Sequence, residues 1–226
     1  MTTAIVGSRI LAALAGVRDP ELDEPITTLG FVASAVVSPD GVAEVHLRLP
    51  TYFCAPNFAY LMVADAYDAV SALDEIRSTT VILDEHFASD AINDGVAARA
   101  GFARSFDGEA AGELDQLRID FIRKSVMAGT DVVCRPLSRD PSDLSAAKLG
   151  DLPPSNALDR LRRRRRELGL PAGDDSPLLI DPITGAPIAA DAVPLHLRKA
   201  RLTRTSLDAN TGICRGMLRH RYPDNG

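Results

Sequence analysis

The chain has 226 residues, a hydrophobic fraction of 46% and a formal net charge of −6 at pH 7. A chain of this length folds as one large domain or as a small domain with an extension. No apolar run reaches the roughly 18 residues that cross a bilayer. The N-terminal stretch lacks the basic leader of a signal peptide. We therefore expect a cytoplasmic protein with no membrane segment.

The three cysteines, Cys54, Cys134 and Cys214, lie far apart and form no C-x-x-C motif. This spacing indicates free thiols in a reducing compartment and excludes a four-cysteine site within one chain. Charge is uneven, because residues 1–150 hold 12 basic against 22 acidic residues and residues 151–226 hold 13 against 9. The protein is acidic overall and its basic tail has almost no aromatics for stacking, so we expect no nucleic-acid partner.

Residues 1–87 predict one small domain. A helix over 3–14 is followed by a strand over 31–37, a turn at 38–41 and a second strand over 42–49. In the second strand Val45 and Leu47 alternate with Glu44 and His46, which is typical of a half-buried hairpin. A helix over 57–73 and a strand over 79–83 complete an α+β fold with the order helix, β-hairpin, helix, strand.

The rest of the chain predicts a largely helical and irregular C-terminal extension. Residues 88–135 are expected to form a helical extension, in which Ser89 caps a helix that ends near Gly101 and a longer helix spans 109–128. Residues 136–226 are expected to be a linker and a basic C-terminal arm, because proline, glycine and Thr-Gly breakers interrupt the pattern. Within this arm Ser155 or Asn156 caps a helix that ends before Gly169.

Cys54 is the candidate working residue of the first domain, because it follows a strand and stands at the entry of a helix. Free N–H groups and the dipole of a helix start favour a negative charge there, and the thiolate is the form that binds soft metals or attacks an electrophile. A buried structural cysteine is the alternative at this position. The residues that form the loop around the thiol are Thr51, Tyr52, Phe53, Pro56 and Asn57.

Asp19-Pro20-Glu21, Leu29-Gly30-Phe31-Val32, the hairpin and Thr51-x-x-Cys54 occur in the order typical of one family. In this order the chain resembles the MIP18/DUF59 family, which includes PaaD-like and SufT-like proteins, over residues 5–85. The resemblance implies that Cys54 serves iron or iron–sulfur assembly, with Asp19 and Glu21 as the next metal ligands. Family members usually have proline two residues before the cysteine and directly after it, where this chain has Tyr52 and Ala55.

The stretch after residue 84 resembles a branch of that family associated with soluble diiron monooxygenases. This resemblance implies an apo-metalloprotein client, with a diiron hydroxylase as the candidate, and an assembly factor rather than an enzyme. One thiolate cannot hold a cluster alone, so a homodimer or a client ligand is expected to complete a transient iron or iron–sulfur site. A metal-free chaperone for a hydroxylase is the alternative function.

Two further groups are weaker candidates. Asp84 and His86 follow the third strand and could join Cys54 as metal ligands if that strand end approaches the loop, or they could form a solvated strand end. A run of five arginines is expected to form a solvated helix face or a partner-binding surface. Its members are Arg162, Arg163, Arg164, Arg165 and Arg166.

Overall fold

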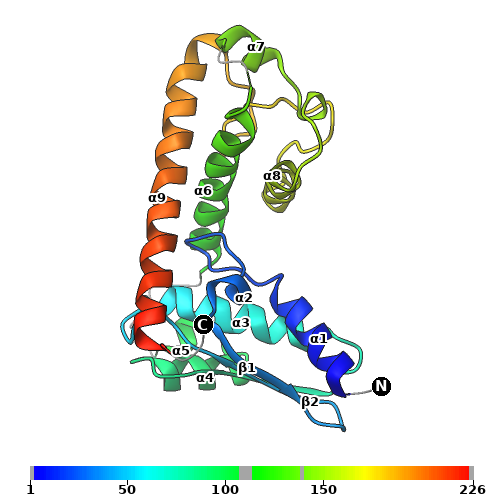
Figure 1. The fold of residues 1–226 in the computed structure, drawn as a ribbon, viewed down its shortest axis with the longest axis vertical. Coiled ribbons are helices and arrows are strands. Elements are labelled where there is room, and N and C mark those ends of the chain that lie inside the picture. Colours follow the sequence, from blue (N-terminus) through cyan, green and yellow to red (C-terminus); the bar gives the residue numbers. More distant parts are fainter. Residues whose placement is uncertain (1–2, 107–113, 138–139, 224–226) are drawn as a thin grey trace. The chain divides into compact units, whose positions relative to one another are not determined.

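The computed structural model describes residues 3–106, 114–137 and 140–223 (Figure 1). The chain divides into two compact units. Unit 1 contains residues 1–115 and 210–226, and unit 2 contains residues 116–209. The two ends of the chain therefore build the same unit.

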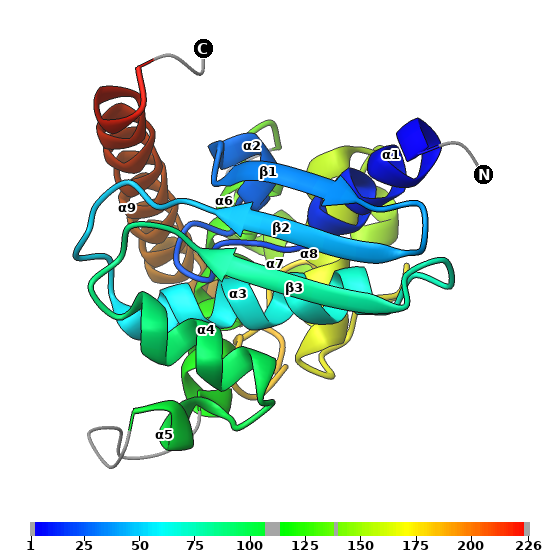
Figure 2. The ribbon, with the colours of Figure 1, turned by 90° about the horizontal axis from the view of Figure 1, so that it is seen from below.

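Unit 1 contains a three-stranded sheet with the strand order β1-β2-β3 (Figure 2). Strands β1 (Val32–Val37) and β2 (Val42–Leu47) form an antiparallel hairpin, and β2 pairs in parallel with β3 (Ser78–Leu83). The hairpin turn includes Gly41 at φ 81°, where a Cβ atom would lie 2.8 Å from the carbonyl oxygen of Glu75. A side chain is excluded at this position by both the backbone conformation and the close approach.

Helices cover one face of this sheet. The parallel pairing of β2 and β3 requires a crossover connection, which α3 (Pro56–Ser71) provides. Helix α1 (Thr3–Leu14) also packs against α3 and β1, and α2 (Ile26–Leu29) is a single turn. The alternation predicted for β2 is confirmed, because Val45 and Leu47 are buried while Glu44 is exposed.

Two short helices, α4 (Ser89–Ala97) and α5 (Phe102–Ser105), follow the sheet. Ser89, the predicted cap, is the first residue of α4, and the helix ends at Ala97 rather than near Gly101. Helix α4 buries Ile92 and Val96 in the core of unit 1. Residues 109–113 of the helix predicted over 109–128 lie outside the described residues, and residues 115–128 fall in α6 (Asp115–Cys134). The predicted α+β class, a small α/β domain followed by a largely helical part, is confirmed.

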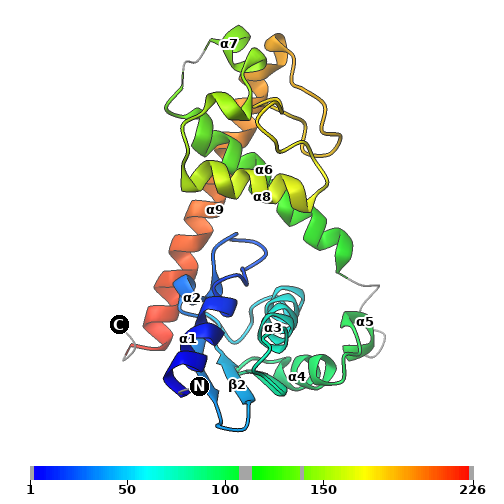
Figure 3. The ribbon, with the colours of Figure 1, turned by 90° about the vertical axis from the view of Figure 1, so that its right-hand side faces the viewer.

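Unit 2 has a core of its own. This core is built by three helices, α6, α7 (Pro141–Ala146) and α8 (Asn156–Glu167), and by the 3₁₀ turn η1 (Leu149–Asp151) (Figure 3). The start of α9 (Val193–Arg221), which follows the 3₁₀ turn η2 (Ala190–Ala192), also contributes to it. The buried leucines and valines come from many short segments, among them Val126, Leu144, Leu149, Leu161, Leu178 and Val193. The division expected at residues 87 and 135 therefore differs from the observed one, because scattered single apolar residues meet in this core.

Helix α9 is the largest departure from the expected linker and arm. It runs for 29 residues and includes Gly212 and Gly216 in its interior. A glycine inside a helix costs about 1 kcal/mol relative to alanine, which a long helix can absorb when packing stabilises it. Leu218, 6% exposed, supplies such packing in the core of unit 1.

None of the helices in the described part of the chain combines the length and apolar character that a membrane crossing needs.

Candidate functional site

Cys54 lies in the loop between β2 and α3, as predicted. Its thiol is partly exposed, and its Sγ atom lies 3.4 Å from the hydroxyl oxygen of Thr51. Helix α3 begins at Pro56, where the fixed φ of proline suits the first helical position. The thiol thus stands two residues before a helix start, reachable from solvent and held by a neighbouring hydroxyl.

His86 fixes the backbone of this loop. Its Nε2 atom donates to the carbonyl oxygen of Cys54 at 2.8 Å, and its Nδ1 atom accepts from the backbone N–H of Ala88 at 3.2 Å. The ring is 3% exposed, and burial lowers the pKa of His86, which favours the neutral form that this pattern requires. Both ring nitrogens are engaged with backbone groups, so His86 is a positioning residue here and not the metal ligand that the sequence indicated.

Asp84 is directed to another partner. The end of β3 does approach the cysteine loop, because the N–H of Phe87 donates to the carbonyl of Tyr52 at 3.1 Å. The carboxylate of Asp84, however, pairs with Nδ1 of His46 at 2.9 Å, and this hydrogen bond raises the pKa of His46. The composite site of Cys54, Asp84 and His86 is therefore not assembled.

Asp19 and Glu21 form a turn between α1 and α2. One carboxylate oxygen of Asp19 accepts from the N–H groups of Glu21 at 2.9 Å and Leu22 at 2.8 Å. Burial raises the pKa of Asp19 to about 6, although these two hydrogen bonds oppose the shift. Glu21 accepts a hydrogen bond from the side chain of Asn210 at 3.2 Å, so this turn meets helix α9.

Cys214 is a second thiol of unit 1, and no ligand spacing in the sequence marks it as a site residue. It lies on α9, partly buried, and packs against the same core as Cys54. Burial, with smaller contributions from nearby acidic groups that include Asp19 and Glu21, raises the pKa of Cys214 to about 11. The sequence does space Asn210, Cys214 and Leu218 at intervals of four residues, which places them on one face of a helix. The polar residues on the rest of the helix concealed this pattern.

A resident metal centre is not preassembled in the described ranges 3–106, 114–137 and 140–223. No group of three or more histidine, cysteine, aspartate or glutamate side chains in them could hold a metal ion. Cys54, Asp19 and Glu21 are thus not gathered into a three-ligand site, and Asp19 and Glu21 have the structural contacts described above.

Three exposed aromatic side chains lie beside the thiol. Tyr52 is 47%, Phe53 76% and Phe87 48% exposed. Their ring centroids are 5.0 Å apart for Tyr52 and Phe53, 6.0 Å for Phe53 and Phe87, and 6.3 Å for Tyr52 and Phe87. We call these three residues the aromatic patch. Clustered exposed aromatics are typical of a protein-binding surface.

The arginine run in α8 does not form one solvated face. Arg165 is fully buried and donates to the carbonyl oxygens of Pro177 at 2.8 Å and Leu178 at 2.5 Å. Burial lowers the pKa of Arg165 to about 10. Arg162 pairs with Asp174, and Arg163 and Arg166 are exposed. Arg165 therefore organises unit 2 internally and is removed from the predicted partner-binding set.

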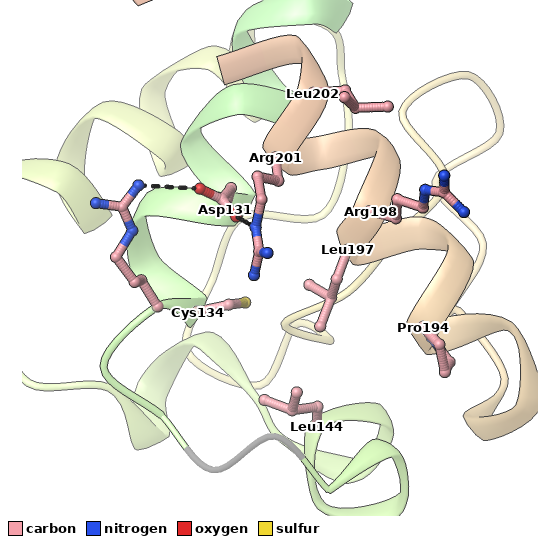
Figure 4. Close-up of a pocket in the computed structure, with 9 residues that line it drawn as sticks. Asp131, Cys134, Leu144, Pro194, Leu197, Arg198, Arg201 and Leu202 are labelled. Carbon is pink, nitrogen blue, oxygen red and sulfur yellow. Dashed lines mark hydrogen bonds and ion pairs between the residues drawn. The ribbon is translucent and has the colours of Figure 1, made fainter. Parts of the chain in front are cut away.

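Unit 2 also contains a half-open cavity of about 510 Å³ between α6, α7 and α9 (Figure 4). Leu144 and Leu197 form its apolar part, while Arg201 extends toward Asp131. Its cysteine, Cys134, is buried, and burial raises the pKa of this thiol to about 12.

Fold and site together define a small α+β domain that presents one positioned thiol at a strand-to-helix loop. Residues 8–83 match the family described as "Iron-sulfur cluster assembly protein". The match covers about a third of the chain, so it is this part that is similar to the family, to which the MIP18/DUF59 proteins belong. The similarity supports a general role in iron–sulfur cluster assembly.

One solved structure that resembles the chain is the domain of unknown function DUF59 from Bacillus anthracis. The match has 19% sequence identity and a TM-score of 0.34, and it covers 43% of this chain and 93% of that chain. The search of curated proteins found no match.

Proposed function

We propose that the protein binds iron or an iron–sulfur cluster transiently through Cys54 and delivers it to a client metalloprotein. The observation that carries this proposal is the position of Cys54, whose thiol is partly exposed while its backbone is held by the buried ring of His86. A thiolate ligand on a fixed backbone can bind iron without ordering the loop first, and partial exposure lets a client ligand replace it.

The cargo needs ligands beyond one thiolate. Iron–sulfur clusters are commonly held by four cysteine thiolates, so a second copy of the chain or residues of the client would complete the coordination. We therefore propose a homodimer or a complex with the client as the loaded state. Free thiols suit the reducing cytoplasm, which is where we place this exchange.

The aromatic patch is the surface on which we propose that the client docks. Phe53 is the residue next to Cys54, so a protein bound to the exposed rings of Tyr52, Phe53 and Phe87 would place its own ligands near the thiol. A diiron hydroxylase is the candidate client, because its carboxylate and histidine site must be loaded with iron.

Replacement of Cys54 by alanine tests this function. The variant should fold as the wild type does, while iron and sulfide retained after anaerobic reconstitution, and activation of the client, should both fall at least tenfold. Cys134→Ala is the matched control, because it removes a thiol from unit 2 and leaves the loop intact. Full client activation by the Cys54 variant would refute the proposal.

A metal-free chaperone is the second candidate, and the exposure of the aromatic patch favours it. Such a protein would bind the apo-hydroxylase through the patch without carrying iron. Iron and sulfide analysis separates the two functions, because client binding by a wild-type protein that retains neither element would support the chaperone.

A further inference from the structure

Helix α9 carries a second thiol, that of Cys214, within unit 1. Asn210, Cys214 and Leu218 follow one another at intervals of four residues, which places them on the same face of the helix. The first bonds to Glu21, and Leu218 enters the core of unit 1, where its Cδ2 atom would lie 3.1 Å from a Cβ built on Gly30. Cys214 lies between them, about 6 Å along the axis from each, and therefore faces unit 1.

The end of α9 is fixed to both segments that hold the Cys54 loop. Arg221 donates to the carbonyl of Leu49 at 3.2 Å, just before the loop begins. It also donates to the carbonyl of Glu85 at 2.7 Å, and His86, the next residue, holds Cys54. Cys54 and Cys214 are both partly buried and pack against the same core.

We propose that Cys54 and Cys214 of one chain bind the iron–sulfur cargo together, as a pair of thiolate ligands. This inference rests on the proposed function and names a second ligand for it. It also accounts for the four thiolate ligands that a [2Fe–2S] cluster takes, because two copies of the chain would each supply two.

The binding step is a ligand exchange. An incoming cluster carried by small thiols has labile Fe–S bonds to those thiols. Each cysteine forms one bond from its sulfur to iron, one bond to a small thiolate breaks, and the cysteine proton goes to that leaving thiolate. The oxidation states of the iron ions do not change.

The experiment compares full-length wild type, Cys54→Ser, Cys214→Ser, the double variant and the control Cys134→Ala. Each protein is reconstituted anaerobically with iron and sulfide and then measured for bound iron, sulfide and native mass. We expect about one iron and one sulfide per chain in a wild-type dimer, and at least a tenfold loss in both single variants. Circular dichroism checks the fold, and Cys214→Ala is the second variant should serine disturb α9.

Cobalt(II) titration provides a second readout, because thiolate-to-cobalt absorption grows with the number of bound thiolates. Loss of either Cys54 or Cys214 should reduce this absorption by about half relative to Cys134→Ala. A Cys214 variant with full iron and full absorption would overturn the pair while leaving the role of Cys54 standing. If the Cys54 variants also keep both, the proposed function itself fails.

Discussion

Each unit of this protein uses one buried polar side chain to fix a loop through its backbone carbonyls. In unit 1 His86 donates to the carbonyl of Cys54, and in unit 2 Arg165 donates to those of Pro177 and Leu178. The loop in unit 1 leaves a thiol partly exposed beside exposed aromatic rings. In unit 2 the fixed segment supplies Leu178 and Leu179 to the core.

The comparison shows that a buried side-chain donor to backbone carbonyls can either stabilise a core or position a reactive group. A buried donor that satisfies backbone carbonyls makes a loop rigid, because leaving those groups unpaired would be costly. Rigidity stabilises the core in unit 2, and in unit 1 it positions a reactive group. Three substitutions can test this contrast.

The largest effect is expected for Arg165→Met. This change leaves buried carbonyls without their donor and should lower the free energy of unfolding by about 3–5 kcal/mol. Chemical denaturation measures the loss, and Arg166→Met is the matched control, because Arg166 is exposed on the same helix. Equal stability of the two variants would contradict the structural role of Arg165.

The next effect is expected for His86→Ala. Loss of the bond to Cys54 should lower the free energy of unfolding by about 2 kcal/mol and reduce retained iron about tenfold. His86→Gln, which keeps an N–H donor, should restore part of the iron binding. A positioning role is contradicted if alanine and glutamine retain iron equally.

His86 also gives the stability a pH dependence of known sign. Because burial lowers its folded-state pKa, the neutral ring stabilises the fold fully above the unfolded value of about 6.5. This contribution is lost as pH falls below that value toward the lowered pKa. Denaturation between pH 5 and 7.5 should show a smaller pH slope in His86→Gln than in the wild type.

The smallest effect on the fold is expected for Phe53→Ser. The ring is 76% exposed, so the free energy of unfolding should change by less than about 0.5 kcal/mol. Client affinity should fall about tenfold, because exposed aromatic anchors commonly contribute over 1 kcal/mol to binding. Titration of the client onto both proteins measures this, and Val36→Ser, an exposed residue on β1, is the control. An unchanged affinity for Phe53→Ser would remove the aromatic patch from the docking surface.

Residue patterns predicted unit 1 well for identifiable reasons. The alternation around Val45 and the turn at Ser38–Gly41 depend on residues that are neighbours in sequence, so both could be predicted directly. These features define the hairpin, and the loop that follows it carries Cys54 to the start of α3. The contacts that α9 makes with the N-terminal part of unit 1 join residues far apart in sequence, so they leave no such local pattern. The positions of Cys214 and Arg221 depend on a helix whose glycines resemble breakers, and His86 and Arg165 carry polar groups that are normally solvated.

The most direct test of the central claim is iron K-edge X-ray absorption on the anaerobically reconstituted full-length protein. If Cys54 binds the cargo, iron in the wild type should show a sulfur shell to which protein thiolates contribute. The Cys54→Ser variant should bind little iron or show that shell diminished, while Cys134→Ala should match the wild type. An identical sulfur shell and iron content in Cys54→Ser would contradict the account.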